Sequence, residues 1–406
     1  MIILIGVAVA VLYFGLLYAA PGPDKTVLET AQGSGNPKVF LNLGLGVLTF
    51  LLLDAVIFHS GLYTMILKPK SQAGAVSTYL RAEQRRPRSA DKEILVVGDS
   101  RVAQGFSSDL ANEMTQGKNV AFVERAVPGT GPRIWHYFLR EIDPTRNRYR
   151  MIVVPLTAED VHGSQKFDDR PSDIVQMAPL LHYSDAFSFA SSFHEWGNQT
   201  RAFTACILRG TAYQSDLFDL LEDPTARLGE VRRGIDSMPR GHTRDRNQDL
   251  TGLVIDPATG GVEEFPDGLS DRQKTRMRRE VKRLRLQAYF AGKNYAWSKQ
   301  IAQRYASSST SIVFLRLPRG PFSSLLRSNE PVRPAADESW LQSHAVVLDS
   351  RMFEFLEAPE YFIDSHHLNE TGQRLFTKRL TEELLARLQI SSAGRAEAGL
   401  VDSLSE

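Results

Sequence analysis

Short apolar segments alternate with amphipathic segments along most of the chain. Glu93–Val97 (EILVV) and Met151–Leu156 (MIVVPL) are rich in apolar, β-branched residues, which is typical of strands buried on both faces. Ile134–Ile142 instead has apolar residues at helical spacing. Strands that alternate with helices in this way predict a doubly wound α/β fold, with a parallel sheet covered on both faces. Further strands are predicted at Val120–Val127, Ser311–Leu317 and Ala345–Leu348, and further helices up to Met114 and at Glu370–Leu388.

One long segment interrupts this alternation. Residues 163–310 separate the third predicted strand from the fourth and far exceed the usual connection length, so we expect a mostly helical insertion or cap. Within it, Arg272–Arg285 (RQKTRMRREVKRLR) predicts a basic helix, which either has a solvated charged face or binds anionic headgroups or an acidic polymer. The α/β domain then comprises residues 93–162 and 311–390, and residues 391–406 are expected to form a flexible tail.

Two long apolar runs lie near the N-terminus. Ile2–Ala20 is uncharged and, at about 1.5 Å per residue, is close to the roughly 30 Å of a bilayer core. A cleaved signal peptide is the competing interpretation, but no Lys or Arg precedes the run and Tyr18 stands where a small residue is expected. Val39–Phe58 predicts a second span. Residues 1–60 are therefore expected to form a transmembrane helical hairpin, followed by a basic linker over residues 61–92.

Asp54 interrupts the second apolar run near its end. Because charge at membrane depth is costly, we expect its carboxylate at the interface near headgroups, or alternatively against a partner's helix. Lysines flank the second run almost equally on both sides, so the positive-inside rule does not orient the chain. Four arginines lie farther from the second run, and including them in the positive-inside count would favour a cytoplasmic main domain: Arg81, Arg85, Arg86 and Arg88.

The composition excludes several classes of protein. Of 406 residues, 42% are hydrophobic, which is ample for a packed core. The 48 Lys and Arg against 47 Asp and Glu leave a net charge of +1, so we expect no nucleic-acid partner. Cys206 is the only cysteine, which rules out an internal disulfide framework and multi-cysteine metal sites. Neither a metal nor another cofactor is expected.

Candidate catalytic residues lie at the ends of the predicted sheet strands, where parallel sheets bind their ligands. Ser100 follows the first strand in a GDSR motif, and a DSHHLN motif at residues 364–369 precedes the last helix. A serine nucleophile needs a base, and an imidazole base needs a carboxylate that orients it. Asp364 and His367 are three positions apart, which on a helical turn places them on one face. All three roles are then filled in one cleft.

These two motifs together resemble those of the SGNH/GDSL hydrolase superfamily. The resemblance covers residues 93–388 without the insertion. It implies an αβα sandwich with a five-stranded parallel sheet, in which Ser100 is the nucleophile, His367 the general base and Asp364 the orienting carboxylate. His366 is the alternative base.

The resemblance extends less well to the oxyanion and substrate-binding residues. Gly129, in AVPGTG, is similar to the family's oxyanion glycine, with Gly131 as the alternative. The family's G-x-N-D motif meets TAED at residues 157–160, so Glu159 replaces the amide donor and precedes Asp160. A carboxylate cannot donate unless it is protonated. This departure predicts a weaker esterase, an oxyanion hole completed from the insertion, or a site without catalysis.

Arg101 replaces the family's leucine, which is similar to membrane-anchored members that modify bacterial envelope polysaccharides. We therefore expect a membrane-anchored serine esterase or O-acyltransferase that acts on acyl groups of a cell-envelope polysaccharide or lipid. The resemblance implies the bacterial inner membrane, a periplasmic catalytic domain, and a membrane-bound O-acyltransferase or polysaccharide synthesis protein as partner. The alternative is a non-catalytic accessory subunit of such a complex, and a cytoplasmic lipase-like enzyme is a third hypothesis.

Overall fold

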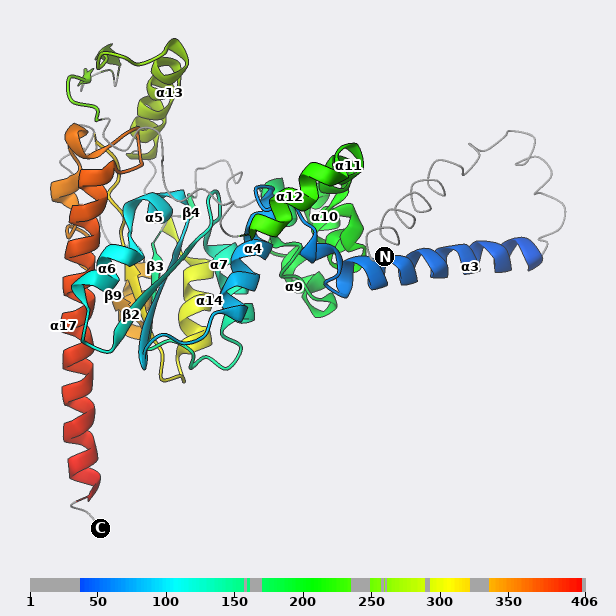
Figure 1. Cartoon of the computed structure of the whole chain (residues 1–406), viewed down its shortest axis with the longest axis horizontal. Helices are drawn as coiled ribbons and strands as arrows, with labels where there is room; N and C mark the ends of the chain where they lie inside the picture. The colour runs from blue at the N-terminus through cyan, green and yellow to red at the C-terminus, as the bar shows by residue number, and fades with distance from the viewer. Residues whose placement is uncertain are drawn as a thin grey trace. The chain divides into compact units, whose positions relative to one another are not determined.

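The computed structural model describes residues 37–156, 159–160, 170–234, 249–256, 259, 261–288, 293–321 and 336–403. The chain divides into two compact units, one of residues 1–78 and 169–238 and the other of residues 79–168 and 239–406 (Figure 1). The first predicted span, Ile2–Ala20, lies outside the described residues, so the transmembrane hairpin stays a prediction.

A five-stranded sheet forms the centre of the second unit. Its strand order is β2-β1-β3-β8-β9 and all of its pairings are parallel. The first strand therefore lies between the second and the third, and the chain winds away from it in both directions, which is a doubly wound order. All five predicted strands are confirmed: β1 (Lys92–Gly98), β2 (Val120–Ala126), β3 (Met151–Pro155), β8 (Ser311–Leu315) and β9 (Val346–Val347).

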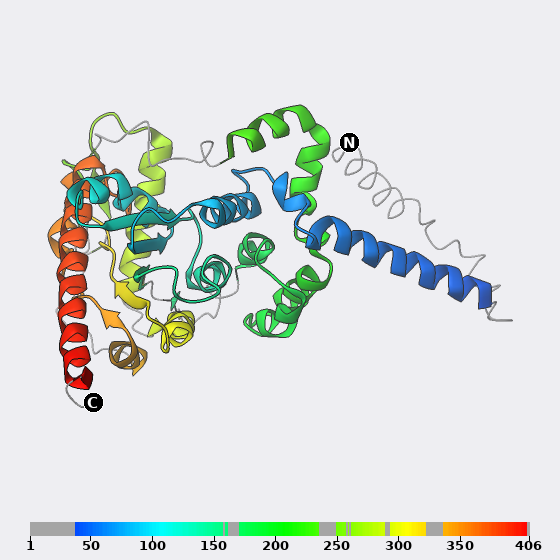
Figure 2. The same ribbon diagram turned by 60° about the horizontal axis from the view of Figure 1, so that its bottom comes forward.

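Helices cover both faces of this sheet, as the α/β prediction requires (Figures 1 and 2). On one face, α17 contacts α5 and α6, and on the other α14 contacts α7 and α16. β3 is buried along its whole length, and a core cluster joins Ile94 and Val96 of β1 to Phe376 and Leu380 of α17. The helices are α5 (Ser100–Gly105), α6 (Ser108–Met114), α7 (Pro132–Ile142), α14 (Ala296–Tyr305), α16 (Ala336–His344) and α17 (Glu370–Ser403).

The last helix is longer than the sequence pattern predicted. α17 continues through Ser403, so the backbone of the segment expected to form a flexible tail, residues 391–406, is helical up to that residue. The added segment contains Ala, Arg, Glu and Leu and no proline. These residues have high intrinsic helix propensity, so a helix can continue without an apolar stripe to mark it.

The first unit begins with an apolar helix. α3 (Pro37–Asp54) continues into a π-helical turn, η1 (Ala55–His59). Residues Gly44–Met65 are long and apolar enough to cross a membrane, and only 11% of their most apolar stretch is buried. This segment overlaps the second predicted span, Val39–Phe58. Its large exposed apolar side chains are Leu45, Val47, Leu48, Leu51, Leu52, Val56, Leu62 and Met65.

Asp54 lies in the interior of the first unit, which corrects its interpretation as an interfacial carboxylate. Its side chain is 1% exposed and accepts hydrogen bonds from the backbone N–H groups of Arg209 (3.0 Å) and Gly210 (2.9 Å). These two groups begin the 3₁₀ turn η4 (Arg209–Thr211), where backbone donors lack a partner within the turn. The Asp54 carboxylate therefore provides the hydrogen-bond acceptor for two backbone N–H groups that lie 155 and 156 positions later in the chain.

The long insertion does not form one cap. Its first half belongs to the first unit, where Asp216 accepts hydrogen bonds from Tyr63 (3.0 Å) and Arg227 (2.8 Å). Its second half, including α13 (Asp271–Ala288) and α14, belongs to the α/β unit. The first-half helices are α8 (Pro171–Met177), α9 (Ala186–Ala190), α10 (Trp196–Ile207), α11 (Gln214–Glu222) and α12 (Pro224–Arg233).

The segment expected to be a basic linker is ordered. It contains α4 (Gln72–Arg85), and Arg86 bridges the carboxylates of Glu83 and Glu93 at 2.7–3.1 Å. One arginine of the basic cluster thus serves an ion-pair network inside the α/β unit. Short elements complete the described chain: η2 (Tyr63–Met65), η3 (Tyr183–Asp185), η6 (Glu354–Leu356), η7 (Pro359–Tyr361), β4 (Glu159–Asp160), β5 (Val254–Ile255), β6 (Val262–Glu264) and β7 (Lys293–Asn294).

Candidate active site

Ser100 lies at the sharp turn where β1 ends and α5 begins. A side chain at Gly98 would collide with Val102, so glycine allows the helix to start directly at the end of the strand. Asp99 caps this helix, because its carboxylate accepts a hydrogen bond from the backbone N–H of Arg101 at 2.9 Å. The turn thus holds Ser100 at the carboxyl end of the first strand, next to the switch point of the sheet.

His367 lies in a loop immediately before α17. One oxygen of Asp364 accepts hydrogen bonds from the backbone N–H groups of His366 (3.0 Å) and His367 (2.9 Å), and a bridge between Phe362 and Leu368 closes the loop. Aspartate commonly stabilises turns in this way. The two residues are therefore brought together by a turn and not by a helical turn, which corrects the reason for their predicted proximity.

The structure brings the three predicted catalytic side chains into one chain of hydrogen bonds. His367 Nδ1 lies 2.8 Å from Asp364 Oδ2, and His367 Nε2 lies 3.0 Å from Ser100 Oγ. With Nδ1 protonated, the imidazole donates to the carboxylate and accepts from the serine hydroxyl. The side chain of His367 is only 8% exposed and that of Asp364 is 21% exposed. This is the geometry that serine-based acyl transfer requires.

The charges around the imidazole fit this arrangement. Burial raises the pKa of the Asp364 carboxyl, but the hydrogen bond with His367 and the positive charges of His367 and His366 lower it more, so its pKa is well below the usual range. Asp364 is therefore ionised at neutral pH and can stabilise an imidazolium. Burial, together with the charge of His367, lowers the pKa of His366 to about 4. His366 Nδ1 contacts Ser365 Oγ at 2.8 Å, so the imidazole on Ser100 is that of His367.

Arg101 is hydrogen-bonded to Asp99, next to Ser100 in the sequence. Its Nε and Nη2 atoms lie 3.0 and 2.7 Å from Asp99 Oδ2. Burial raises the pKa of Asp99, but the Arg101 guanidinium outweighs this effect and leaves the pKa lower than usual. The predicted substrate-binding role of Arg101 stays a prediction, and its observed contact stabilises the turn that carries Ser100.

Gly129 lies on the loop after β2, which is attached to the end of β1. The backbone N–H of Val127 donates to the carbonyl of Gly98 at 2.8 Å, and the hydroxyl of Thr130 donates to the carbonyl of Val127 at 2.6 Å. Gly129 has a φ of 75°, a conformation that favours glycine, whereas the alternative, Gly131, is extended and begins α7. Both glycines thus lie on a loop that is hydrogen-bonded to Gly98, two residues before Ser100 in the sequence.

The sequence departure at Glu159 lies on β4. This strand pairs antiparallel with β7, and Glu159 is in register with Asn294. A strand from the insertion, β7, therefore runs beside Glu159, the position at which the resemblance predicts an amide donor. The side chains of Glu159 and Asp160 lie outside the described part of the structure, so the predicted loss of a donor stays a prediction.

Sequence reasoning did not place Arg276 at the site. Arg276 Nη2, on α13, lies 4.0 Å from Asp364 Oδ2. The available signal was the spacing of Arg272, Arg276 and Arg279, which places three arginines on one helix face. That spacing alone could not show which part of the molecule the face adjoins.

Side-chain donors of Asp364, His366 and His367 lie within 4.8 Å of one another, a spacing that could also suit a metal ion. In the described structure these donors point at other groups: His367 at Asp364 and Ser100, and His366 at Ser365. The imidazole with one nitrogen on a carboxylate and the other on a hydroxyl favours proton transfer at Ser100.

No protein-family model matches this chain, and no curated protein matches it significantly. The class of the protein therefore rests on its own fold and site. These define a doubly wound α/β domain with a serine, a histidine and an aspartate hydrogen-bonded in series at the carboxyl end of the sheet.

Proposed function

We propose that the chain is a membrane-anchored serine esterase or O-acyltransferase that acts on acyl groups of a cell-envelope polysaccharide or lipid. The observation that carries this proposal is the series Ser100 Oγ, His367 Nε2, His367 Nδ1 and Asp364 Oδ2, with contacts of 3.0 and 2.8 Å. Ser100 and His367 are 267 positions apart in the sequence, yet their side chains meet at the carboxyl end of the sheet.

The chemistry follows from this geometry. Ser100 Oγ attacks the acyl carbonyl while His367 Nε2 takes its proton, and ionised Asp364 stabilises the imidazolium that forms. His367 then protonates the departing alcohol, which leaves an acyl-serine. Water or a sugar hydroxyl attacks this acyl group in the second step, giving hydrolysis or transfer. Backbone N–H groups of Ser100 and Gly129 would stabilise the negative oxygen of the tetrahedral intermediates.

The apolar segment Gly44–Met65 supports the membrane part of the proposal. Anchoring would keep the α/β unit at the surface where an envelope glycan is made or exported. We place the protein in the bacterial inner membrane with this unit on the periplasmic side, working with a membrane-bound O-acyltransferase or a polysaccharide synthesis protein.

A serine-directed probe tests the proposal. The full chain in detergent is treated with a fluorophosphonate, and turnover of a short-chain nitrophenyl ester is followed. We expect wild type to be labelled, and Ser100→Ala and His367→Ala each to lose labelling and at least about 10³-fold in turnover. Ser343→Ala is the matched control, since the hydroxyl of this exposed serine of α16 contacts the Trp340 carbonyl and His344 Nδ1 on its own helix. A folded wild type that is neither labelled nor active would contradict the proposal.

A non-catalytic accessory subunit is the second candidate. Glu159 in place of an amide donor favours it, because an ionised carboxylate repels a developing oxyanion. This candidate requires a folded wild type that binds acylated glycan but does not react with the fluorophosphonate.

A further inference from the structure

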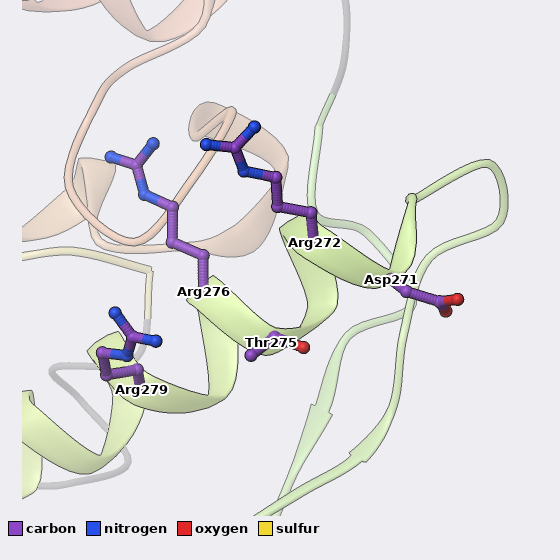
Figure 3. Close-up of a pocket in the computed structure, with 5 residues that line it drawn as sticks. All are labelled: Asp271, Arg272, Thr275, Arg276 and Arg279. Atoms are coloured by element: carbon purple, nitrogen blue, oxygen red, sulfur yellow. The ribbon is translucent and has the colours of Figure 1, made fainter.

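Three arginines of α13 form a row on one side of the helix. Arg272, Arg276 and Arg279 follow the i, i+4, i+7 spacing, and their side chains extend to the same side (Figure 3). With Asp271 and Thr275 they line a pocket of about 460 Å³. At a helical rise of about 1.5 Å per residue, the row covers roughly 10 Å along the helix.

The cations on the opposite side of the same helix pack against an aromatic ring of the protein. Lys274 and Arg278 lie over the ring of Phe265, at 5.8 and 4.7 Å from its centroid. Such cation–π contacts tie these two cations to the protein itself. Basic residues on α13 therefore divide into a packed pair, Lys274 and Arg278, and the arginine row.

Few ion pairs occupy the arginine row, although Asp271 lines the same pocket. Among the described residues, neither Arg272 nor Arg279 has an ion-pair partner, and Arg276 has only the 4.0 Å contact with Asp364. The Arg276 side chain is 59% exposed. Guanidinium groups bind carboxylates through two parallel hydrogen bonds, so a row of them suits a ligand with repeated carboxylates.

The middle residue of the row, Arg276, lies 4.0 Å from Asp364, the carboxylate that ends the Ser100–His367–Asp364 series. A polymer bound along the row would therefore pass the site at Asp364. The arginine row is exposed, but it lines a pocket, while Lys274 and Arg278 face Phe265, so the described part of α13 does not present one broad cationic face to a membrane. The pocket and the contact of Arg276 with Asp364 favour a linear anionic ligand.

We infer that the arginine row binds the carboxylates of an acidic glycan, so that the substrate is an acylated polymer of uronic acids. This inference rests on the proposed function for the reaction at Ser100, but the binding itself requires no reaction.

Binding is measured with the full-length Ser100→Ala chain in detergent, by calorimetry with O-acetylated polygalacturonate and with a neutral O-acetylated glucan. We expect the acidic polymer to bind and the neutral one to bind at least tenfold more weakly. Arg272→Gln/Arg279→Gln should weaken binding of the acidic polymer roughly tenfold or more, because two charge-assisted contacts are lost. Lys274→Gln/Arg278→Gln removes the same charge from the same helix and should change binding less than twofold. Added salt should weaken the wild-type interaction.

Equal binding of acidic and neutral polymers, or equal loss in the two double variants, would overturn the inference. Binding to phosphatidylglycerol vesicles but not to the polymer, with the same dependence on Arg272 and Arg279, would overturn it in favour of lipid headgroups. The fluorophosphonate result is independent. Arginine-dependent binding by an unlabelled wild type would refute catalysis and keep the inference, and labelling without such binding would do the opposite.

Discussion

Two carboxylates in the α/β unit hold positive partners in different ways. Glu83, on α4, is 0% exposed and is surrounded by Arg86, Arg125 and Arg148 at 2.8–2.9 Å and by the Tyr149 hydroxyl at 2.7 Å. Asp364 has one imidazole at 2.8 Å and two backbone N–H groups, and is 21% exposed. Burial raises the pKa of both carboxyls, and hydrogen bonds and positive partners bring it below the usual range.

The difference lies in where each network ends. Both carboxylate oxygens of Glu83 accept from side chains of the same unit. Glu83 therefore connects α4 to β2 and to the segment before β3. The network of Asp364 continues through His367 to a hydroxyl at a strand end. The enclosed network of Glu83 can act only on stability, whereas the network of Asp364 ends at Ser100, the nucleophile of the proposed function. Mutations should therefore separate stability from activity at these two carboxylates.

The largest expected effect is on activity at Asp364. Asp364→Asn keeps an oxygen for the backbone N–H groups of His366 and His367, but it cannot hold the imidazole in the tautomer that accepts from Ser100. We expect ester turnover to fall about 10⁴-fold, as for the equivalent change in serine proteases, with the melting temperature within a few degrees of wild type. Steady-state kinetics and thermal denaturation measure the two quantities.

Asp349→Asn is the matched control, since Asp349 makes a similar turn by accepting from the backbone N–H of Arg351 at 2.9 Å. It should leave turnover unchanged. Comparable losses in both variants, or a large loss of stability at Asp364, would remove the distinction between the two centres.

The second effect is on stability at Glu83. Glu83→Gln leaves Arg86, Arg125 and Arg148 with an amide in place of a buried charge, and it places N–H donors against guanidinium groups. Removal of one partner of a buried ion pair typically costs about 3–5 kcal/mol. We expect that decrease in the free energy of unfolding at pH 7 in urea titrations, with turnover per folded molecule little changed.

Glu124 offers a control on the adjacent strand β2. Burial raises the pKa of its carboxyl to about 7, so much of it is already uncharged at neutral pH. Its oxygen accepts from the backbone N–H of Ala126 at 3.0 Å, a contact that glutamine can keep. Glu124→Gln should therefore cost less than about 1 kcal/mol. If Glu83→Gln costs no more than this control, the enclosed network is not a stabilising one.

The sheet could be predicted because the residue composition of its strands reflects their burial. β1 and β3 are short, β-branched and buried on both faces, so the local composition already contains the tertiary environment. Ser100 and His367 could be predicted because each motif has a fixed place relative to a strand or helix end. Their mutual distance needed only the topology of the sheet.

Contacts between distant polar residues could not be predicted. The partners of Asp54 lie 155 positions away, and Arg276 and Asp364 come from different elements. No local period encodes which buried charge meets which donor. For the same reason the sequence predicts one cap for the long insertion, since helical spacing in residues 170–234 shows an apolar face but not the unit that covers it.

The smallest expected effect concerns His366, the neighbour that is not in contact with Ser100. Its pKa of about 4 is below the ordinary value of about 6.5, because burial and the charge of His367 disfavour its protonated form. The folded protein then binds this proton less tightly than the unfolded chain does. His366 therefore costs no stability above pH 6.5, and its cost grows as the pH falls from 6.5 towards 4.

His366→Asn should remove that cost, because asparagine does not titrate while its amide can still pair with Ser365. We expect the free energy of unfolding of the variant, relative to wild type, to rise by at most about 2 kcal/mol between pH 6.5 and pH 5. Turnover and its pH profile should match those of wild type within about threefold, since His367 alone contacts Ser100. Urea titrations at several pH values and pH–rate profiles measure both. A variant as inactive as His367→Ala would instead make His366 part of the proton path, and the network of Asp364 would then branch.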